Sequence, residues 1–135
     1  NQQMYDNLQA TFAYDKQLCL LGFTDQVSLL MDASDVIFTK PGGITSTEAI
    51  VKNIPIVHTA PIPGLENYNA RFFHNHGLSY HSNDTNQQVA IAMRLCEDKA
   101  FRNRMLQQQR LNSNPHTSDD VIDLILNKQE IAYEE

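Results

Sequence analysis

The residues best suited to chemistry are two glycines followed by hydroxyl side chains, within residues 35–48, which read Asp-Val-Ile-Phe-Thr-Lys-Pro-Gly-Gly-Ile-Thr-Ser-Thr-Glu. A buried strand is predicted to end before Pro41, and a helix is predicted to begin after Gly43. The first N–H groups of a helix have no partner inside it, and the helix dipole makes this end positive, so phosphates favour it. The hydroxyls of Thr45, Ser46 and Thr47 add donors, and the first few helical residues include no carboxylate. The segment therefore predicts a phosphate site, and the alternative is an ordinary helix start with Thr and Ser as caps.

Glu48 lies about one turn into this predicted helix. Its carboxylate could accept hydrogen bonds from a sugar diol that lies beyond the phosphates. The segment has no Gly-Lys-Ser/Thr of a P-loop and no Gly-x-Gly-x-x-Gly of a dinucleotide-binding turn, so neither of those motifs accounts for it.

A second polar helix start follows the next predicted strand, residues 54–58. Pro-Ile-Pro-Gly at residues 61–64 predicts a rigid loop, and the helix after it presents Glu66, Asn67 and Asn69. Carboxylate and amide groups suit sugar hydroxyls, which both donate and accept hydrogen bonds. Parallel strands would place both helix starts at one edge of the sheet. A binding site is therefore favoured over a proline-stiffened loop with ordinary caps.

A third segment, Gly-Phe-Thr-Asp at residues 22–25, follows an apolar run and is expected at the same edge. A backbone N–H and C=O here could pair with the edge of a planar base. The alternative is that Asp25 caps the next helix.

Short apolar runs alternate with helical patterns along the chain. Strands are predicted near residues 18–22, 35–39, 54–58 and 78–80, and helices near 27–33, 44–52, 66–76 and 99–111 and from 118. Another helix is predicted to be capped at Asn83-Asp84 and to carry Val89 and Cys96. The strands are continuous apolar runs, and each precedes a helix. This pattern predicts an α/β fold, with a parallel sheet covered by helices on both faces.

The chain has 135 residues, 41% hydrophobic and 19% charged, with a formal net charge of −6. This balance predicts one globular domain over residues 1–135, and the acidic charge argues against a nucleic-acid partner. Cys19 and Cys96 have no zinc spacing and are predicted to be buried, small apolar residues, so no metal site is expected. None of the five histidines stands out as a catalytic base.

Together these segments resemble the carboxy-terminal, donor-binding domain of nucleotide-sugar glycosyltransferases with two Rossmann-like halves, the GT-B architecture. The similarity is to the family 28-type enzymes, which include the processive diacylglycerol β-glucosyltransferases and the monogalactosyldiacylglycerol synthases. It rests on Leu-Gly-Phe-Thr-Asp at 21–25, on residues 33–49, on Pro-Ile-Pro-Gly-Leu-Glu at 61–66 and on Asn-Ala-Arg at 69–71. Lys-Pro-Gly-Gly-x-Thr together with Pro-Ile-Pro-Gly is typical of the lipid-glycosylating branch.

The resemblance implies a site for a UDP-sugar, with no cofactor, metal ion or catalytic residue in these residues. It assigns the backbone of Phe23 to uracil, Gly42, Gly43, Ile44 and Thr45 to the diphosphate, Glu48 to the ribose, and Glu66 to the sugar, with Gly64, Leu65 and Asn69 beside it. Relatives usually have Pro-Gly-Gln-Glu, and Leu65 here cannot make the amide contact to the donor sugar.

The resemblance also implies an inverting transfer of glucose or galactose from a UDP-sugar to a diacylglycerol-type lipid. In the family the acceptor site and the general base lie in an amino-terminal domain. Residues 1–135 are therefore interpreted as a donor-binding fragment of a two-domain enzyme that lacks its first strand–helix unit and is inactive alone. Two alternatives stay open: a UDP-sugar 2-epimerase, against which the Pro-Ile-Pro-Gly loop speaks, and a non-catalytic nucleotide-binding subunit of a split glycosyltransferase.

The implied location is cytoplasmic and peripheral, at the inner face of the cell membrane. A basic stretch could touch an anionic membrane surface, or could be a solvated helix face; it comprises Arg94, Lys99, Arg102, Arg104 and Arg110. A missing first strand should leave an exposed sheet edge, through which the chain is expected to self-associate.

Overall fold

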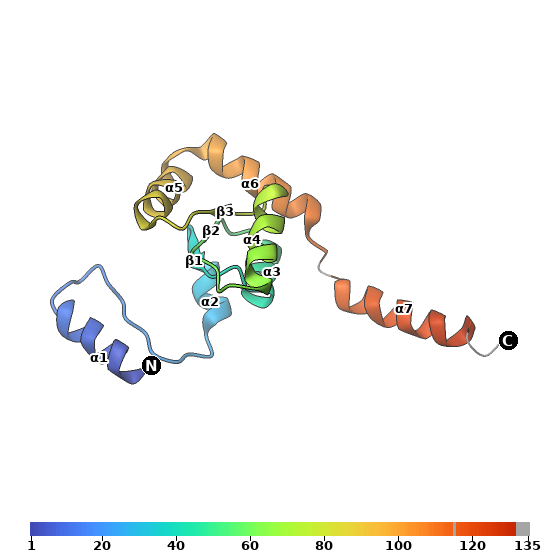
Figure 1. Ribbon diagram of the computed structural model, residues 1–135, viewed down its shortest axis with the longest axis horizontal. Helices are drawn as coiled ribbons and strands as arrows, with labels where there is room; N and C mark the ends of the chain where they lie inside the picture. Colours follow the sequence, from blue (N-terminus) through green and yellow to red (C-terminus); the bar gives the residue numbers. More distant parts are fainter. Residues whose placement is uncertain (115, 132–135) are drawn as a thin grey trace. The chain divides into compact units, whose positions relative to one another are not determined.

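The computed structural model describes residues 1–114 and 116–131, and it divides into two compact units, residues 1–30 and the remainder from Met31. The second unit contains a three-stranded sheet in the order β1 (Ile37–Thr39), β2 (Ile56–His58), β3 (Tyr80–His81) (Figure 1). Both pairs of strands are parallel, with Ile37 beside Ile56 and Val57 beside Tyr80. The predicted parallel α/β sheet is therefore confirmed.

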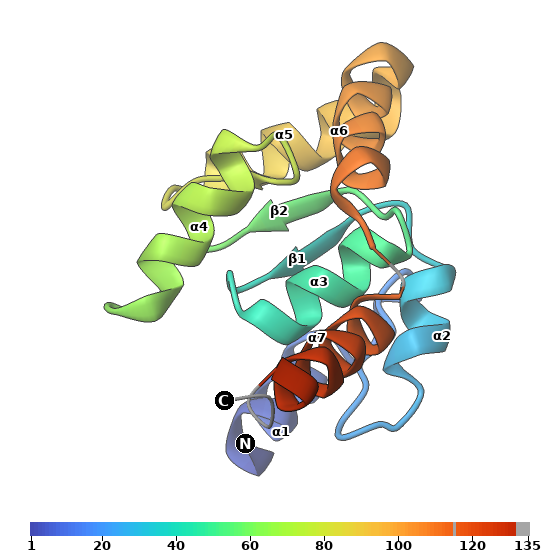
Figure 2. The same ribbon diagram turned by 90° about the vertical axis from the view of Figure 1, so that its right-hand side faces the viewer.

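Helices cover both faces of this sheet (Figure 2). On one face α3 (Gly43–Val51) and α4 (Leu65–Asn75) pack on Ile56, and on the other α5 (Thr85–Glu97) and α6 (Lys99–Asn112) pack on Val57. Successive side chains of a strand point to opposite faces, so a strand buried on both faces must be apolar throughout. Ile56 and Val57 are both 0% exposed, which explains the continuous apolar run.

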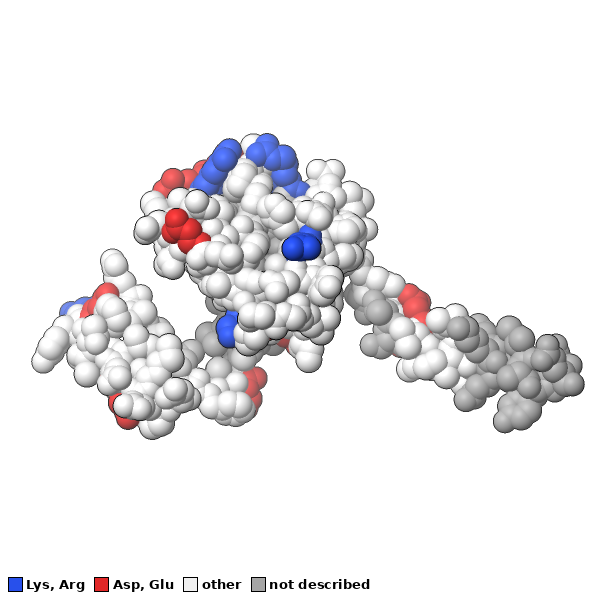
Figure 3. Space-filling model, viewed as in Figure 1, with Lys and Arg blue, Asp and Glu red and all other residues white. Residues whose placement is uncertain are grey.

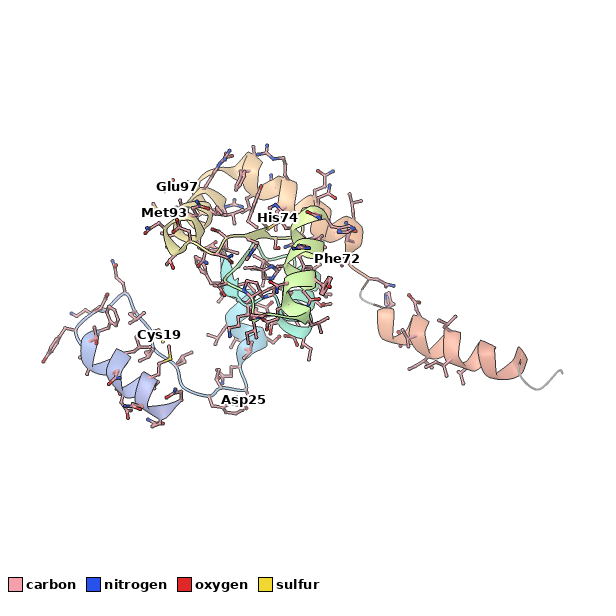
Figure 4. The ribbon with its side chains drawn as sticks, viewed as in Figure 1. Cys19, Asp25, Phe72, His74, Met93 and Glu97 are labelled. Carbon is pink, nitrogen blue, oxygen red and sulfur yellow. The ribbon has the colours of Figure 1, made fainter. Side chains whose placement is uncertain are left out.

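The first unit contains α1 (Gln2–Thr11) and an extended segment, and α2 (Val27–Asp32) crosses the boundary between the units. The predicted strand at residues 18–22 is wrong, because these residues form no strand. A strand is held by hydrogen bonds to a neighbouring strand, and no strand in the described residues pairs with this segment. Cys19, on this segment, is exposed (Figure 4). Cys96 is exposed too, so the predicted burial of both cysteines is also wrong.

Carboxylates and one amide fix the α5–α6 layer. Asp84 and Asp98 accept hydrogen bonds from backbone N–H groups in the first turns of α5 and α6, as N-caps do. The side chain of Gln109 is 0% exposed, and its Nε2 donates to the carbonyls of Ile54 and Leu78, at 2.9 Å each. Gln109 therefore joins α6 to the chain just before β2 and β3.

The remaining helix, α7, spans Thr117–Ile131. Among the described residues, no helix has the length and apolar character needed to cross a membrane.

β1 and β3 are the edge strands of the sheet, and Phe38 on β1 is 47% exposed. Self-association through such an edge stays a prediction.

Candidate functional site

The first turn of α3 presents free backbone donors. Gly42 is the N-cap and supplies no side-chain hydrogen bond, and Ser46 is the first residue whose N–H turns back, to the Gly42 carbonyl at 3.3 Å. The N–H groups of Gly43, Ile44 and Thr45 thus have no acceptor in the described part of the chain. No acidic residue lies in this turn. The positive end of the helix dipole and three free donors can therefore receive an anion.

The space in front of this turn is open. A Cβ built on Gly42 or on Gly43 would meet nothing within 4 Å, and the φ of Gly42 is −75°, a value open to any residue. Neither crowding nor backbone strain within the chain therefore requires these glycines. What they provide is close access of an outside group to the backbone.

Some of the predicted donors are already engaged. The Gly42 N–H donates to the Lys40 carbonyl at 2.7 Å, and the Thr47 hydroxyl donates to the Gly43 carbonyl at 2.7 Å, a common bond for a helical Thr. The Ser46 hydroxyl is buried and lies 2.9 Å from Nε2 of His58. Of the predicted phosphate donors, the amides of Gly43, Ile44 and Thr45 and the hydroxyl of Thr45 therefore remain.

The α4 start is built differently. Gly64, its N-cap, has φ 117°, where only glycine is unstrained. The Glu66 carboxylate accepts the Ile62 N–H at 2.7 Å, which closes the Pro-Ile-Pro-Gly loop. Asn69 donates from Nδ2 to the Pro41 carbonyl at 3.0 Å. This bond confirms that the starts of α3 and α4 lie side by side. A depression lined by Gly64, Asn67, Tyr68 and Arg71 opens at the α4 start.

The other predicted site residues are at the surface. The Glu48 side chain is exposed and has no hydrogen bond or ion pair with any described residue. Leu65 is 76% exposed and Ile44 80% exposed, on α4 and α3. Phe23 is also fully exposed, but it belongs to the first unit, so its place beside a base stays a prediction.

Two residues beside this site are absent from the sequence-based assignment. Lys40 is exposed and directly precedes the Pro-Gly-Gly turn, where its charge can act on a bound anion. His58 ends β2 and is 0% exposed, with both ring nitrogens in hydrogen-bond contact with serines. Burial, and secondarily the charge of His81, lowers the pKa of His58 to about 4. A polar residue at the end of an apolar strand is the sequence signal that points to it.

Residues 1–112 match the model of a family described as glycosyl transferases, group 1. A protein named processive diacylglycerol beta-glucosyltransferase from Bacillus pumilus is 30% identical over 129 residues, which cover 96% of this chain and 33% of that protein. Proteins of the same name are 29% identical over 129 residues in Staphylococcus epidermidis (93% of this chain, 33% of that protein) and 28% identical over 114 residues in Bacillus thuringiensis (84% and 29%).

The chain spans about one third of the length of these curated relatives. The family model, by contrast, matches most of the chain, including the whole sheet and the α3 and α4 starts. The chain therefore belongs to the group 1 glycosyl transferases.

Proposed function

We propose that this chain is the nucleotide-sugar-binding part of an enzyme that transfers a hexose from a UDP-sugar to a diacylglycerol-type lipid. The observation that carries the proposal is the pair of adjacent helix starts, one with free donors and no acid, the other with Glu66 and Asn69. A diphosphate needs the first and sugar hydroxyls suit the second. The names of the relatives support diacylglycerol as the acceptor and glucose as the hexose, and they favour transfer over epimerisation.

The chemistry follows from where negative charge develops. When the bond between the sugar and the diphosphate breaks, charge grows on the departing phosphate. The free amides of Gly43, Ile44 and Thr45 and the positive end of α3 would stabilise it without reorganisation. Glu48 would hold the ribose, and Glu66 and Asn69 would hold the sugar, beside Gly64 and Leu65.

The acceptor hydroxyl needs a general base for direct, inverting attack on the anomeric carbon. We place this base and the lipid site outside residues 1–135, so the chain alone should bind the donor and transfer nothing. Formation of a glucosyl- or galactosyl-lipid by the purified chain would contradict this part of the proposal.

A peripheral membrane contact is also proposed. Basic side chains appear over α5 and α6 (Figure 3). Arg94 pairs with Asp98 at 3.5 Å, and Arg102 donates to the carbonyls of Leu95 and Cys96. Arg104 lies over the Phe101 ring, 5.5 Å from its centroid, and Arg110 lies 2.9 Å from the side-chain amide of Asn53. Lys99 has no such partner among the described residues, so it is the basic side chain most available to an anionic surface.

The direct test is calorimetric titration of the chain with UDP, with Gly43→Ala as the variant. The added Cβ enters the open space before the free amides, so UDP affinity should fall about tenfold, or about 1.4 kcal/mol. The melting temperature should hold or rise, because Ala favours a helix over Gly by up to about 1 kcal/mol.

The matched control is Val51→Ala, an exposed change at the other end of α3, which should leave UDP affinity unaltered. Failure of the parent chain to bind UDP, or equal binding by Gly43→Ala, would contradict the proposed site.

A further inference from the structure

His58 joins three elements on the α3–α4 face of the sheet. Its Nε2 lies 2.9 Å from Oγ of Ser46 in α3, and its Nδ1 lies 2.9 Å from Oγ of Ser79, just before β3. The ring of Phe73, on α4, packs against it with 5.4 Å between centroids. A neutral imidazole has one N–H donor and one acceptor nitrogen, so one serine donates to the ring and the other accepts from it.

This arrangement is closed to substrates. Ser46 and His58 are each 0% exposed and Ser79 is 2% exposed. A general base must reach the proton it removes, and a nucleophile must reach the reacting carbon. These side chains can reach neither, although a serine beside a histidine is an arrangement that catalysis also uses. Their effect must pass through the backbone that they hold.

The backbone in question is the first turn of α3. In α5 and α6 an aspartate cap bonds to the first N–H groups and fixes the helix start. In α3 the Gly42 cap supplies no such bond, so the amides of Gly43 to Thr45 stay free. A helix start that keeps its amides for a ligand must be held from another direction, and Ser46, the next residue along, is held by His58 from the core.

We propose that His58 is a positioning residue for the nucleotide site, holding the uncapped first turn of α3 through Ser46 so that its free amides meet the diphosphate in a fixed geometry. The inference rests on the UDP site proposed above. It assigns to His58 a role in donor binding that its burial, taken alone, does not reveal.

The test compares two variants of this contact with a matched change elsewhere. Ser46→Ala removes only the link to α3, and since Ala is a good helix former, this variant should fold even if His58→Asn does not. Gln109→Met is the control, because it removes a fully buried amide that also braces β2 and β3, but through Ile54 and Leu78 and not through α3.

Two readouts are taken on each purified chain: the affinity for UDP by calorimetry, and the amide NMR signals of Gly43, Ile44 and Thr45 without ligand. Ser46→Ala and His58→Asn should each weaken UDP binding about tenfold and shift these signals. Gln109→Met should lower the melting temperature and change neither readout.

Parent-like UDP affinity and parent-like signals in Ser46→Ala would overturn the inference. So would a loss of UDP affinity in Gln109→Met as large as in Ser46→Ala, because any loosening of the core would then suffice. If the parent chain binds no UDP, the proposed function fails, while the amide signals still decide whether His58 holds the turn.

Discussion

The starts of α3 and α4 lie side by side at one edge of the sheet, yet they differ in charge and in how they are held. The α3 start has three free amides and no acid, and it is fixed from the core by Ser46 and His58. The α4 start carries Glu66, whose carboxylate is already bonded to the loop, and it is fixed by the bond from Asn69 to Pro41.

The difference shows how one sheet edge can serve two parts of a ligand. Parallel strands bring every following helix start to the same edge, and each start is positive by default. An acid in the first turn cancels that charge and adds acceptors, as at α4, whereas its absence keeps the charge for an anion, as at α3. This contrast is why we propose that the diphosphate binds at α3 and the sugar at α4, and each half of the proposal can be tested separately.

Acidification should place a charge on the buried His58 ring, and this should give the largest effect on stability. The pKa of His58 falls from 6.5 to about 4 on folding, so the unfolded chain binds this proton more tightly. The stability that depends on neutral His58 is complete above pH 6.5 and is lost as the pH falls toward 4. The loss should reach about 3 kcal/mol, at 1.36 kcal/mol for each pKa unit.

Urea unfolding between pH 7 and pH 4 measures this loss. In His58→Asn, the contribution of His58 to the pH dependence of the free energy of unfolding should disappear. In His74→Gln, which changes an exposed histidine of α4, this contribution should remain. A parent-like slope in His58→Asn would assign the pH dependence to other groups, with His81 beside it as the first to examine.

A carboxylate in the first turn of α3, such as α4 has in Glu66, should stabilise the fold and weaken UDP binding. Ile44 is the second residue of α3, as Glu66 is of α4, and it is 80% exposed, so Ile44→Glu needs no repacking. The new carboxylate should stabilise the helix by about 0.3–1 kcal/mol. At about 7 Å and an effective dielectric constant of about 20 it should repel a phosphate charge by about 2 kcal/mol.

Ile44→Gln is the matched neutral control, and it should bind UDP like the parent chain. Calorimetry at low and at moderate salt should show a smaller difference between the two variants as the salt rises, because salt screens exposed charges. Equal UDP affinity for Ile44→Glu and Ile44→Gln would place the diphosphate elsewhere.

Glu48→Gln tests whether the ribose lies beyond the α3 start. Hydrogen bonds to a charged group contribute about 1–3 kcal/mol, so UDP affinity should fall by that amount, and by somewhat more in Glu48→Ala. The melting temperature should hold, since Glu48 is exposed and contacts no described polar group. Unchanged UDP affinity at an unchanged melting temperature would make Glu48 an ordinary surface residue.

Much of this site can be predicted from local sequence, because Pro, Gly and short apolar runs act within a few residues. They place the starts of α3 and α4 one residue from where the structure has them, at Gly43 and Leu65. The strand predicted at residues 18–22 fails because apolarity does not supply a hydrogen-bonding neighbour. The contacts of His58 could not be predicted from local sequence, because Ser46 and Ser79 lie 12 and 21 residues away along the chain.

The smallest expected effect concerns the α4 start and the sugar alone. Leu65 is 76% exposed at the first position of α4, so Leu65→Gln replaces an exposed apolar side chain and should not lower the melting temperature. The new amide can both donate to and accept from a sugar hydroxyl, and such a bond contributes about 1 kcal/mol. UDP itself has no hexose, so its affinity should stay the same, while UDP-glucose or UDP-galactose should bind about fivefold more tightly relative to UDP.

The control is Leu65→Met, which has a side chain of similar size and no amide. It should leave the affinity of each UDP-hexose, relative to that of UDP, as it is in the parent chain. Titrations of both UDP-hexoses and of UDP into the three chains would show which hexose gains more from the amide. A gain for UDP equal to that for the UDP-hexoses would mean that α4, like α3, contacts the nucleotide, and the division between the two helix starts would then be wrong.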